Sequence, residues 1–288
     1  MAEDLAGRIA AATGTGVASV RPVGAQHRWR MYRAELDDGR SAFVKAAAGP
    51  LGDLFATEAA GLAWLGDADG APVPEVLGHD ATLLALAWLD TGRADAAAAE
   101  RFGRDLARMH AARADAFGAP WPGFIAELPL DNTPGDAWPA WYAERRVAPY
   151  LRRAVDAGDL SASDARPIER VLARIEDLAG PPVRPARIHG DCWSGNVLWS
   201  SGRGWLVDPA AHGGHPETDL AMLDLFGAPH LPRILAAYEE VTPLPGRAAR
   251  VPLHQLHPLL VHVCLFGGGY RAAAVDAAEA ALRAGLAG

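Results

Sequence analysis

The spacing of apolar and polar residues divides the chain into an extended first part and a longer helical part. Up to about residue 89, short apolar runs alternate with turn residues, and Asp37-Asp38-Gly39-Arg40 is a typical hairpin turn. The expected elements, in chain order, are a helix ending near Gly14, strands at 17–23, 29–36 and 41–47, a helix at 51–66, and strands at 76–80 and 82–89. This pattern predicts a small antiparallel β lobe with one internal helix.

From about residue 90 onward, the apolar residues recur at the spacing of amphipathic helices. The expected elements are helices at 95–114, 138–158 and 161–180, two short strands at 197–199 and 204–208 joined by a turn at 201–204, and four helices from Asp219 to the C-terminus. We therefore expect an α+β, bilobal fold, with a β lobe at 1–89 and a larger, mainly helical lobe at 90–288.

Composition excludes several classes of protein. The formal net charge of −8 and the pI of about 5.7 argue against a nucleic-acid-binding surface, which needs basic residues to neutralise phosphates. Two cysteines, Cys192 and Cys264, are too few for a disulfide framework, which predicts a reduced, cytoplasmic setting. No signal-peptide pattern and no long apolar run is present, so no membrane partner is expected. The pattern gives no indication of oligomeric state.

The most informative motif is HGDCWSGN at 189–196, followed by VDPA at 207–210. Asp191 with Asn196 five residues later is the catalytic-loop pattern of kinases, in which the aspartate accepts the proton of the attacking hydroxyl and the asparagine holds magnesium. Asp208, at the end of the next short apolar strand, is expected to hold the metal from the other side. Magnesium prefers few, hard oxygen ligands, so this set predicts a phosphotransferase site for ATP and Mg²⁺.

The only lysine of the chain, Lys45, supports the same interpretation. A kinase needs a compact ammonium at the α- and β-phosphates of ATP, and the fork of an arginine does not replace it. Glu58, in the following helix, is expected to hold this lysine by an ion pair. Gly24 lies where a glycine-rich phosphate loop would join two strands, although the segment has no GxGxxG pattern and a plain hairpin is an alternative. A β lobe carrying the lysine, followed by a helical lobe carrying the motif, predicts a protein-kinase-like fold with its site between the lobes.

Histidine pairs suggest a different chemistry. His212 with His215, and His254 with His257, invite a zinc interpretation and, with it, a metal-dependent hydrolase. No third type of ligand lies near either pair in the sequence, so we expect these histidines to be core or surface residues.

These motifs together resemble the fructosamine-3-kinase, or ketosamine-3-kinase, family within the protein-kinase-like and aminoglycoside-phosphotransferase superfamily. The resemblance covers most of the chain. It is carried by FVK at 43–45, TEAAGLAWL at 57–65, FGRDLARMH at 102–110, WPAWYAERRVAPYL at 138–151, HGDCWSGNVLW at 189–199, VDPAAHGGHPETDLAMLDLFG at 207–227 and HQLHPLLVHVCLFGGGY at 254–270. The HGD, Asn and Asp pattern alone fits any small-molecule kinase of the superfamily, whereas WSGN, HGGH and LFGGGY in one chain are much narrower.

The resemblance implies transfer of the γ-phosphate of ATP to the 3-hydroxyl of a ketosamine, a sugar linked to a free amine or a protein lysine. The product then falls apart and frees the amine, which is deglycation. By resemblance, Asp191 is the base, Asn196 and Asp208 bind the metal, and Lys45 with Glu58 organises ATP. The hinge at 82–89 places Leu86 and Trp88 against adenine, and Asp219 buttresses the catalytic loop.

Three residues are candidates for substrate contact. His189 is expected mainly to shape the catalytic loop, Trp193 either to line the acceptor pocket or to pack under the loop, and Trp141 to lie in a segment that lines the cleft. An aminoglycoside would require a strongly acidic site, whereas these segments are aromatic and partly basic. Other small-molecule kinases, acting on an aminoglycoside, choline or a sugar, and a non-catalytic pseudokinase remain the alternatives.

The chain departs from the family pattern at three positions. Ala25 stands where a second glycine of the phosphate loop is expected, Ala87 where the hinge commonly has an acidic residue, and Pro216 where a basic residue follows GGH. The phosphate loop also contains no cysteine, so redox control through it is not expected. None of these changes removes a catalytic group, and we expect an active enzyme.

Overall fold

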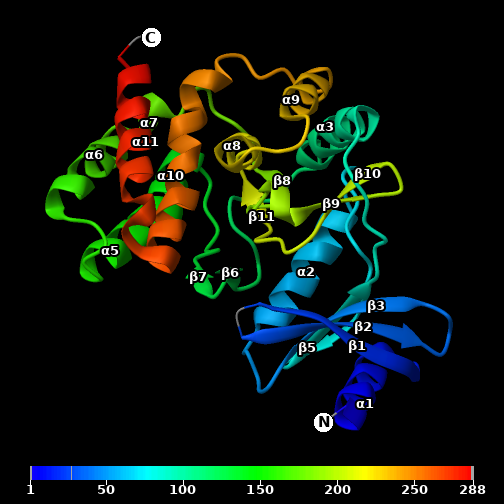
Figure 1. The fold of residues 1–288 in the computed structure, drawn as a ribbon. Coiled ribbons are helices and arrows are strands. Elements are labelled where there is room, and N and C mark those ends of the chain that lie inside the picture. The colour runs from blue at the N-terminus through cyan, green and yellow to red at the C-terminus, as the bar shows by residue number, and fades with distance from the viewer. Residues whose placement is uncertain (1, 27, 287–288) are drawn as a thin grey trace.

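The computed structural model describes residues 2–26 and 28–286. A five-stranded antiparallel sheet lies at one end of the molecule and most helices lie at the other, as Figure 1 shows. The sheet has the order β1-β2-β3-β5-β4. Its strands are β1 (Val17–Gln26), β2 (Trp29–Leu36), β3 (Ser41–Ala47), β4 (Val76–Asp80) and β5 (Leu83–Ala87). Helix α1 (Ala2–Thr13) precedes the sheet, and α2 (Leu54–Gly66) follows β3.

Alternation along the central strands gives each face of the sheet its own helix. Val44 of β3 and Ala85 of β5 share an apolar cluster with Ile9 of α1. Leu84 and Leu86 of β5 point the other way and pack with Phe55 of α2. Because successive side chains of a strand alternate between faces, Lys45 follows Val44 onto the α2 side. The register of β3 thereby aims the lone lysine at the interior between the sheet and the helices.

The rest of the described chain contains helices, with six short strands in three pairs between them. The helices are α3 (Ala96–Ala111), α4 (Trp138–Tyr142), α5 (Ala148–Asp156), α6 (Ala162–Ala173), α7 (Ile175–Leu178), α8 (Glu217–Phe226), α9 (Leu231–Glu239), α10 (Arg247–Phe266) and α11 (Arg271–Ala284). The strand pairs are β6 (Gly123–Ile125) with β7 (Leu128–Leu130), β8 (Ala186–Ile188) with β11 (His212–Gly214), and β9 (Val197–Ser200) with β10 (Arg203–Leu206). This arrangement confirms the predicted α+β fold class.

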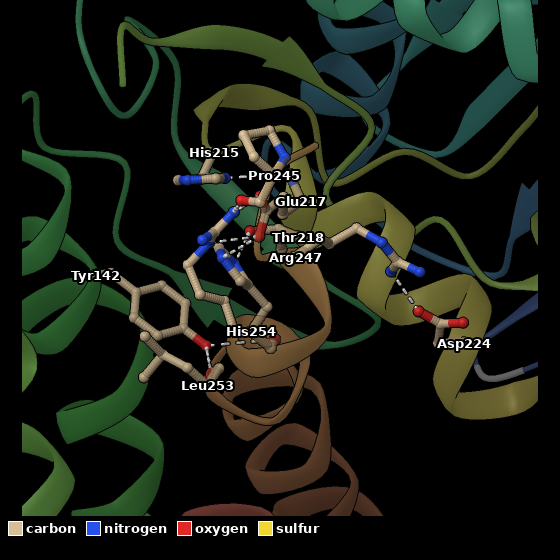
Figure 2. Close-up of polar contacts among 10 residues, drawn as sticks. Tyr142, His215, Glu217, Thr218, Asp224, Pro245, Arg247, Leu253 and His254 are labelled. Atoms are coloured by element: carbon tan, nitrogen blue, oxygen red, sulfur yellow. Dashed lines mark hydrogen bonds and ion pairs between the residues drawn. The ribbon is translucent and has the colours of Figure 1, made fainter. Parts of the chain in front are cut away.

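Two helical segments are less regular than predicted. The helix expected at 138–158 contains a π-helical turn at Ala143–Val147 between α4 and α5. In α10, Pro258 has no N–H, so the carbonyl of His254 loses its helical donor. The hydroxyl of Tyr142 lies 2.9 Å from the carbonyl oxygen of Leu253 and 3.4 Å from that of His254 (Figure 2). The hydroxyl donates mainly to Leu253 and accepts the backbone N–H of His257 at 3.3 Å, so a side chain from α4 enters the backbone hydrogen bonding of α10 around Pro258.

The C-terminal segment Arg247–Ala284 contains an 18-residue window whose mean hydropathy, 1.3, and length would suit a helix able to cross a membrane. In the structure, Gly267 has φ 71° and ends α10, and a 3₁₀ turn leads into α11. Helix α10 packs against α5 and α8, and α11 packs against α6. Buried helices of soluble proteins meet the same two criteria, so this segment does not by itself indicate a membrane span, and the absence of a membrane partner stays a prediction.

The connection from the sheet to the helical part runs from the end of β5 at Ala87 to the start of α3 at Ala96. Asp95 caps α3, because its side chain accepts a hydrogen bond from the backbone N–H of Ala98. The predicted division into lobes at 1–89 and 90–288 falls within this connection and stays a prediction.

Candidate active site

The lone lysine lies between two carboxylates. The Nζ of Lys45 is 2.8 Å from each carboxylate oxygen of Glu58 in α2 and 2.7 Å from Oδ1 of Asp208, which follows β10. Lys45 is 2% exposed, and burial alone lowers the pKa of an ammonium. The two carboxylates outweigh burial and raise the pKa of Lys45 above its usual value, so the lysine stays charged.

The two carboxylates are not equivalent. Burial raises the pKa of Glu58 although Lys45 opposes this shift, and Asp208 adds to it. Asp208 is more accessible, and its backbone has φ 54°, a left-handed conformation that residues other than glycine rarely adopt. Such a backbone persists where the surrounding structure holds it, often at functional sites. This turn directs the carboxylate of Asp208 back toward Lys45.

Asp219 of α8 holds the loop between β8 and β9 through hydrogen bonds to its backbone. The carboxylate of Asp219 accepts hydrogen bonds from the backbone N–H groups of His189, at 2.7 Å, and Gly190, at 2.9 Å. Burial would raise the pKa of Asp219, but hydrogen bonding and charge from His110 lower it below its usual value. His110 Nε2 lies 3.0 Å from Asp219, and its Nδ1 lies 2.9 Å from the hydroxyl of Tyr238. A buried network thus fixes the loop that carries Asp191.

Glycine is required in this loop at one position. Gly190 has φ 79°, and a Cβ at this residue would lie 2.3 Å from the carbonyl oxygen of Ala210. Any larger residue would push the loop away from the segment that follows Asp208. The glycine of the HGD motif is therefore a consequence of close backbone approach.

Asp191 and Asn196 contact each other directly. Asn196 Nδ2 donates to the backbone oxygen of Asp191 at 2.9 Å and to its Oδ2 at 3.0 Å. Burial raises the pKa of Asp191 to about 7; the hydrogen bond from Asn196 opposes the shift, and the charges of Asp208 and Asp219 add to it. Because Nδ2 is committed to Asp191, the Oδ1 of Asn196 is left to face a cation. With the carboxylate of Asp208, it offers the hard oxygens that fit a divalent metal.

These groups line one cavity, which reaches from the sheet to α10. Lys45, Glu58, Asp191, Asn196 and Asp208 form one part of its wall. The remaining wall is mainly apolar and comes from distant segments: Trp29, Leu54, Phe124, Ile125, Trp193, Met222, Pro258, Val261, His262, Leu265 and Phe266. A charged set beside an apolar wall can position a phosphoryl donor and an uncharged acceptor.

A second cavity shares Asp208 with the first and lies against the connection after β5. Its wall includes Phe43, Leu86, Trp88, Leu198 and Val207. The predicted hinge residues Leu86 and Trp88 therefore lie together in an apolar slot next to the charged groups. Such a slot suits the flat face of a nucleotide base.

Comparisons with known proteins agree with this geometry. A sequence model of the fructosamine kinase family matches residues 1–284. A probable ketoamine kinase of Thermus thermophilus is 35% identical over 232 residues, which are 79% of this chain and 82% of the relative. A candidate fructosamine-3-kinase from Thermobifida fusca, known from a crystal structure, is 56% identical with a TM-score of 0.95, covering 97% of this chain and 98% of that chain. The chain belongs to the fructosamine kinase family.

Membership in the fructosamine kinase family makes the chain an ATP-dependent phosphotransferase, as predicted. An aminoglycoside phosphotransferase aligns over 98% of this chain and 99% of its own at 15% identity, with a TM-score of 0.63. At this identity the likeness concerns the fold alone, and it confirms the predicted protein-kinase-like fold.

Two predicted site residues of this kinase lie away from the cavity. Trp141 is 4% exposed, donates from Nε1 to the carbonyl oxygen of Thr133 at 2.9 Å, and carries the guanidinium of Arg146 4.2 Å above its ring. It is a core residue, so its predicted place in the cleft wall is corrected. Gly24 lies inside β1, paired with Met31 of β2, and not in the connection between these strands. The plain hairpin alternative describes this segment better than a phosphate loop through Gly24.

The two other candidates for substrate contact in this kinase differ from each other. His189 is fully buried; its Nε2 donates to the carbonyl oxygen of Val207, and its Nδ1 accepts from the backbone N–H of Asp191. Both ring nitrogens are engaged, so His189 shapes the loop and does not reach the cavity. Trp193 lines the cavity, is 40% exposed, and lies over Gly195, where a Cβ would meet its ring at 2.2 Å. Trp193 therefore lines the cavity and also packs on its own loop, and its contact with the acceptor stays a prediction.

The sequence prediction missed the wall contributed by β6 and by the end of α10. Phe124 and Ile125 come from a strand of three residues, which is too short to show periodicity. His262, Leu265 and Phe266 lie within the HQLHPLLVHVCLFGGGY segment, which carried the family resemblance but no predicted role. The HQLHPLLVHVCLFGGGY motif was therefore the sequence signal from which a role for His262, Leu265 and Phe266 could have been predicted.

Four histidines of this kinase, His212, His215, His254 and His257, form a buried cluster separate from the cavity. His215, Glu217 and His254 place potential metal-binding atoms within 4.8 Å of one another, and Figure 2 shows their contacts. His215 Nδ1 accepts the backbone N–H of Glu217, so its Nε2 carries the proton and cannot bind a metal. Both carboxylate oxygens of Glu217 accept hydrogen bonds from Arg250. This donor set does not fit a zinc ion.

Proposed function

We propose that this chain transfers the γ-phosphate of ATP to the 3-hydroxyl of ketosamines, such as ribulosamines and fructosamines on free amines or protein lysines, and so promotes their deglycation. The observation that carries the proposal is the complete set of Lys45, Glu58, Asp191, Asn196 and Asp208 along one cavity with an otherwise apolar wall. Membership in the fructosamine kinase family supports the ketosamine as acceptor.

In the proposed reaction, Asp191 accepts the proton of the sugar hydroxyl. The hydroxyl oxygen then forms a bond to the γ-phosphorus, the bond from this phosphorus to the oxygen bridging to the β-phosphate breaks, and ADP leaves with that oxygen. A pKa of Asp191 near 7 keeps part of the population ionised and still basic enough to accept a proton at neutral pH.

The residues of the charged set can neutralise the negative charge of the ATP phosphates. Lys45, held by Glu58, supplies the ammonium at the α- and β-phosphates once it leaves Asp208. Asn196 and Asp208 would hold Mg²⁺, which neutralises phosphate charge when bound. We place adenine in the slot formed by Phe43, Leu86 and Trp88. A cytoplasmic setting and the absence of nucleic-acid partners stay predictions from composition.

The test is phosphate transfer from ATP and Mg²⁺ to a panel of ribulose-lysine, fructose-lysine, kanamycin, choline and buffer alone, with products identified by mass spectrometry. We expect a phosphorylated ketosamine and no phosphorylated kanamycin or choline. If only kanamycin or choline were phosphorylated, the assignment of ketosamines as substrates would be overturned, but the chain would still be a kinase. Absence of transfer to every acceptor, with ATP bound, would favour a non-catalytic nucleotide-binding protein.

A further inference from the structure

Three rings of the cavity wall, those of Trp193, His262 and Phe266, belong to a continuous row of aromatic side chains that Phe226 and Tyr270 complete outside the lining. Trp193 contacts Phe226 with ring centroids 6.2 Å apart, and Phe226 lies 4.8 Å from the ring of His262. His262 in turn lies 5.5 Å from Phe266 and 4.8 Å from Tyr270. We name these five residues the aromatic ladder. It begins beside the catalytic loop and runs along the end of α10 to the surface.

Charge is confined to the other end of the cavity. The charged side chains among the described lining residues are Lys45, Glu58, Asp191 and Asp208. Lys45 binds Glu58 and Asp208, and Asn196 donates a hydrogen bond to Asp191. Beside the ladder, the wall consists of Met222, Pro258, Val261 and Leu265. None of the described residues that line the cavity beside the ladder is charged, so a short substituent lying against this wall meets no charged partner there; Asp159 and Arg271 lie farther out, beside Gly267 and Gly268.

The ladder contains one polar atom with a defined role. His262 Nδ1 lies 2.7 Å from the carbonyl oxygen of Pro258, and since a carbonyl only accepts, Nδ1 carries the proton. Burial lowers the pKa of His262, which keeps the ring neutral. Its Nε2 is then a hydrogen-bond acceptor in an otherwise apolar wall.

The aromatic side chain at the outer end of the ladder is largely exposed to solvent. Phe266 is 62% exposed at the end of α10, where the glycine turn from Gly267 brings Tyr270 back against His262. Exposed apolar side chains that continue from a cavity mark binding surfaces. The continuity of Phe266 with the wall near Asp191 points to the part of the acceptor that extends outward from the reacting sugar.

We propose that the aromatic ladder is the subsite for the amine substituent of the ketosamine and selects apolar or aromatic amines over charged ones. This inference rests on the proposed function. Phe266 and Tyr270 cover the apolar substituent, and His262 Nε2 accepts the N–H of the amine that links it to the sugar. A carboxylate or a second ammonium on the substituent would lose water without gaining a partner.

The experiment compares steady-state kinetics for three conjugates of whichever sugar, ribulose or fructose, is phosphorylated in the acceptor panel. The amines are benzylamine, β-alanine and ethylenediamine, so that the substituent is aromatic, anionic or cationic. We expect kcat/KM for the benzylamine conjugate to exceed both others by at least about tenfold, mainly through KM, since apolar groups in a fitting pocket give roughly ten- to two-hundredfold discrimination.

Two variants at the exposed end of the ladder test the assignment with little risk to folding. Phe266→Ala should reduce kcat/KM for the benzylamine conjugate by about tenfold and that for the β-alanine conjugate by a smaller factor. Phe266→Lys should raise the relative rate with the β-alanine conjugate. Val241→Ala, at a similarly exposed apolar residue after α9, is the matched control and should change none of the rates.

The outcomes separate the two proposals. Equal kcat/KM for all three conjugates, or an equal loss for all three in Phe266→Ala, would overturn the subsite while the ketosamine kinase stands. If the wild-type protein phosphorylates no ketosamine, the proposed function fails and the subsite fails with it. A preference for the aromatic conjugate that disappears in Phe266→Ala and persists in Val241→Ala would establish the subsite.

Discussion

The charged end of the active-site cavity and the buried histidine cluster are two regions in which titratable groups are removed from water, with opposite results. In the cavity, Lys45 stands between two carboxylates, so charges of opposite sign compensate burial. The buried histidine cluster consists of His212, His215, His254 and His257, each at most 3% exposed. Burial lowers the pKa of all four, and that of His215 to about 3.

Access distinguishes the regions as clearly as charge. The cavity at Asp191 is open and lined by groups from both parts of the molecule. The cavity beside His212, His215 and His257 measures about 10 Å³, which is room for no more than about one water molecule. A strongly shifted pKa is therefore insufficient to mark a catalytic site. Opposite charges and an opening to the ligand are also needed, and only the first region has both.

The largest effect is expected at the base. Asp191→Asn removes the proton acceptor while preserving shape and the contact with Asn196, so turnover should fall by on the order of 10²–10⁴. ATP binding, measured by calorimetry, should persist because Lys45 and the adenine slot are unchanged. Retained turnover would exclude Asp191 as the base and weaken the contrast between the regions.

The second-largest loss of activity is expected from replacing Lys45, the cation that compensates the two carboxylates. Lys45→Arg should reduce kcat by at least about tenfold, because a planar guanidinium cannot occupy the space of an ammonium shared by Glu58 and Asp208. Arg40→Lys, at the exposed turn before β3, is the control and should have normal activity. A near-normal rate in Lys45→Arg would show that the point charge at this position is incidental.

The histidine cluster should influence stability and not catalysis. An unfolded histidine has a pKa of about 6.5 and binds protons below it, whereas the buried ones stay neutral, so stability is full above about pH 6.5 and is lost as pH falls. His257→Gln should reduce this slope by up to about 1.4 kcal/mol per pH unit, measured by denaturant unfolding between pH 7.5 and 5.5.

Comparison of variants isolates this effect. Glu58 and Asp191, whose pKa values are raised, act in the opposite direction in the wild-type protein and in the variant alike. His79→Gln, at an exposed position of β4, is the matched control and should keep the wild-type slope. Identical slopes in the wild type and His257→Gln would mean that His257 takes up protons in the folded protein as it does in the unfolded chain, and would contradict its burial in the neutral form.

The smallest effect is expected from chelation. Because His215 and Glu217 already use their donor and acceptor atoms, treatment with EDTA should leave the Tm unchanged, and metal analysis should find no stoichiometric zinc. One zinc per chain, with a Tm that falls on chelation, would make the cluster a metal site and remove the contrast with the cavity.

Much of the fold was predictable where an element was long enough for its pattern of apolar and polar residues to show a period. The strands expected at 29–36 and 41–47 coincide with β2 and β3, and four helices follow the catalytic segment as expected. The three-residue strands β6, β7, β8 and β11 were not predicted, because so few residues show no period. The π-helical turn at Ala143–Val147 was also missed, since its residues keep a helical pattern of polarity.

At the site, the sequence by itself determined the reactive groups. The HGD motif places Asp191 and Asn196 five residues apart on one loop, and the register of β3 with the following helix brings Lys45 to Glu58. These relations depend on neighbours in the chain and on regular local geometry. They can therefore be inferred from spacing and residue type alone.

Only the tertiary structure decided which aromatic and histidine side chains meet the ligand space. Trp193 lines the cavity whereas Trp141 is buried in the core, and His262 joins the wall whereas His254 and His257 are enclosed. The three histidines lie in one apolar helical stretch of the sequence, and neither tryptophan has a neighbouring pattern that reveals its exposure. Their exposure depends on how α4, α8 and α10 pack, and packing between distant segments is set by the shapes and hydrogen bonds of the whole interior.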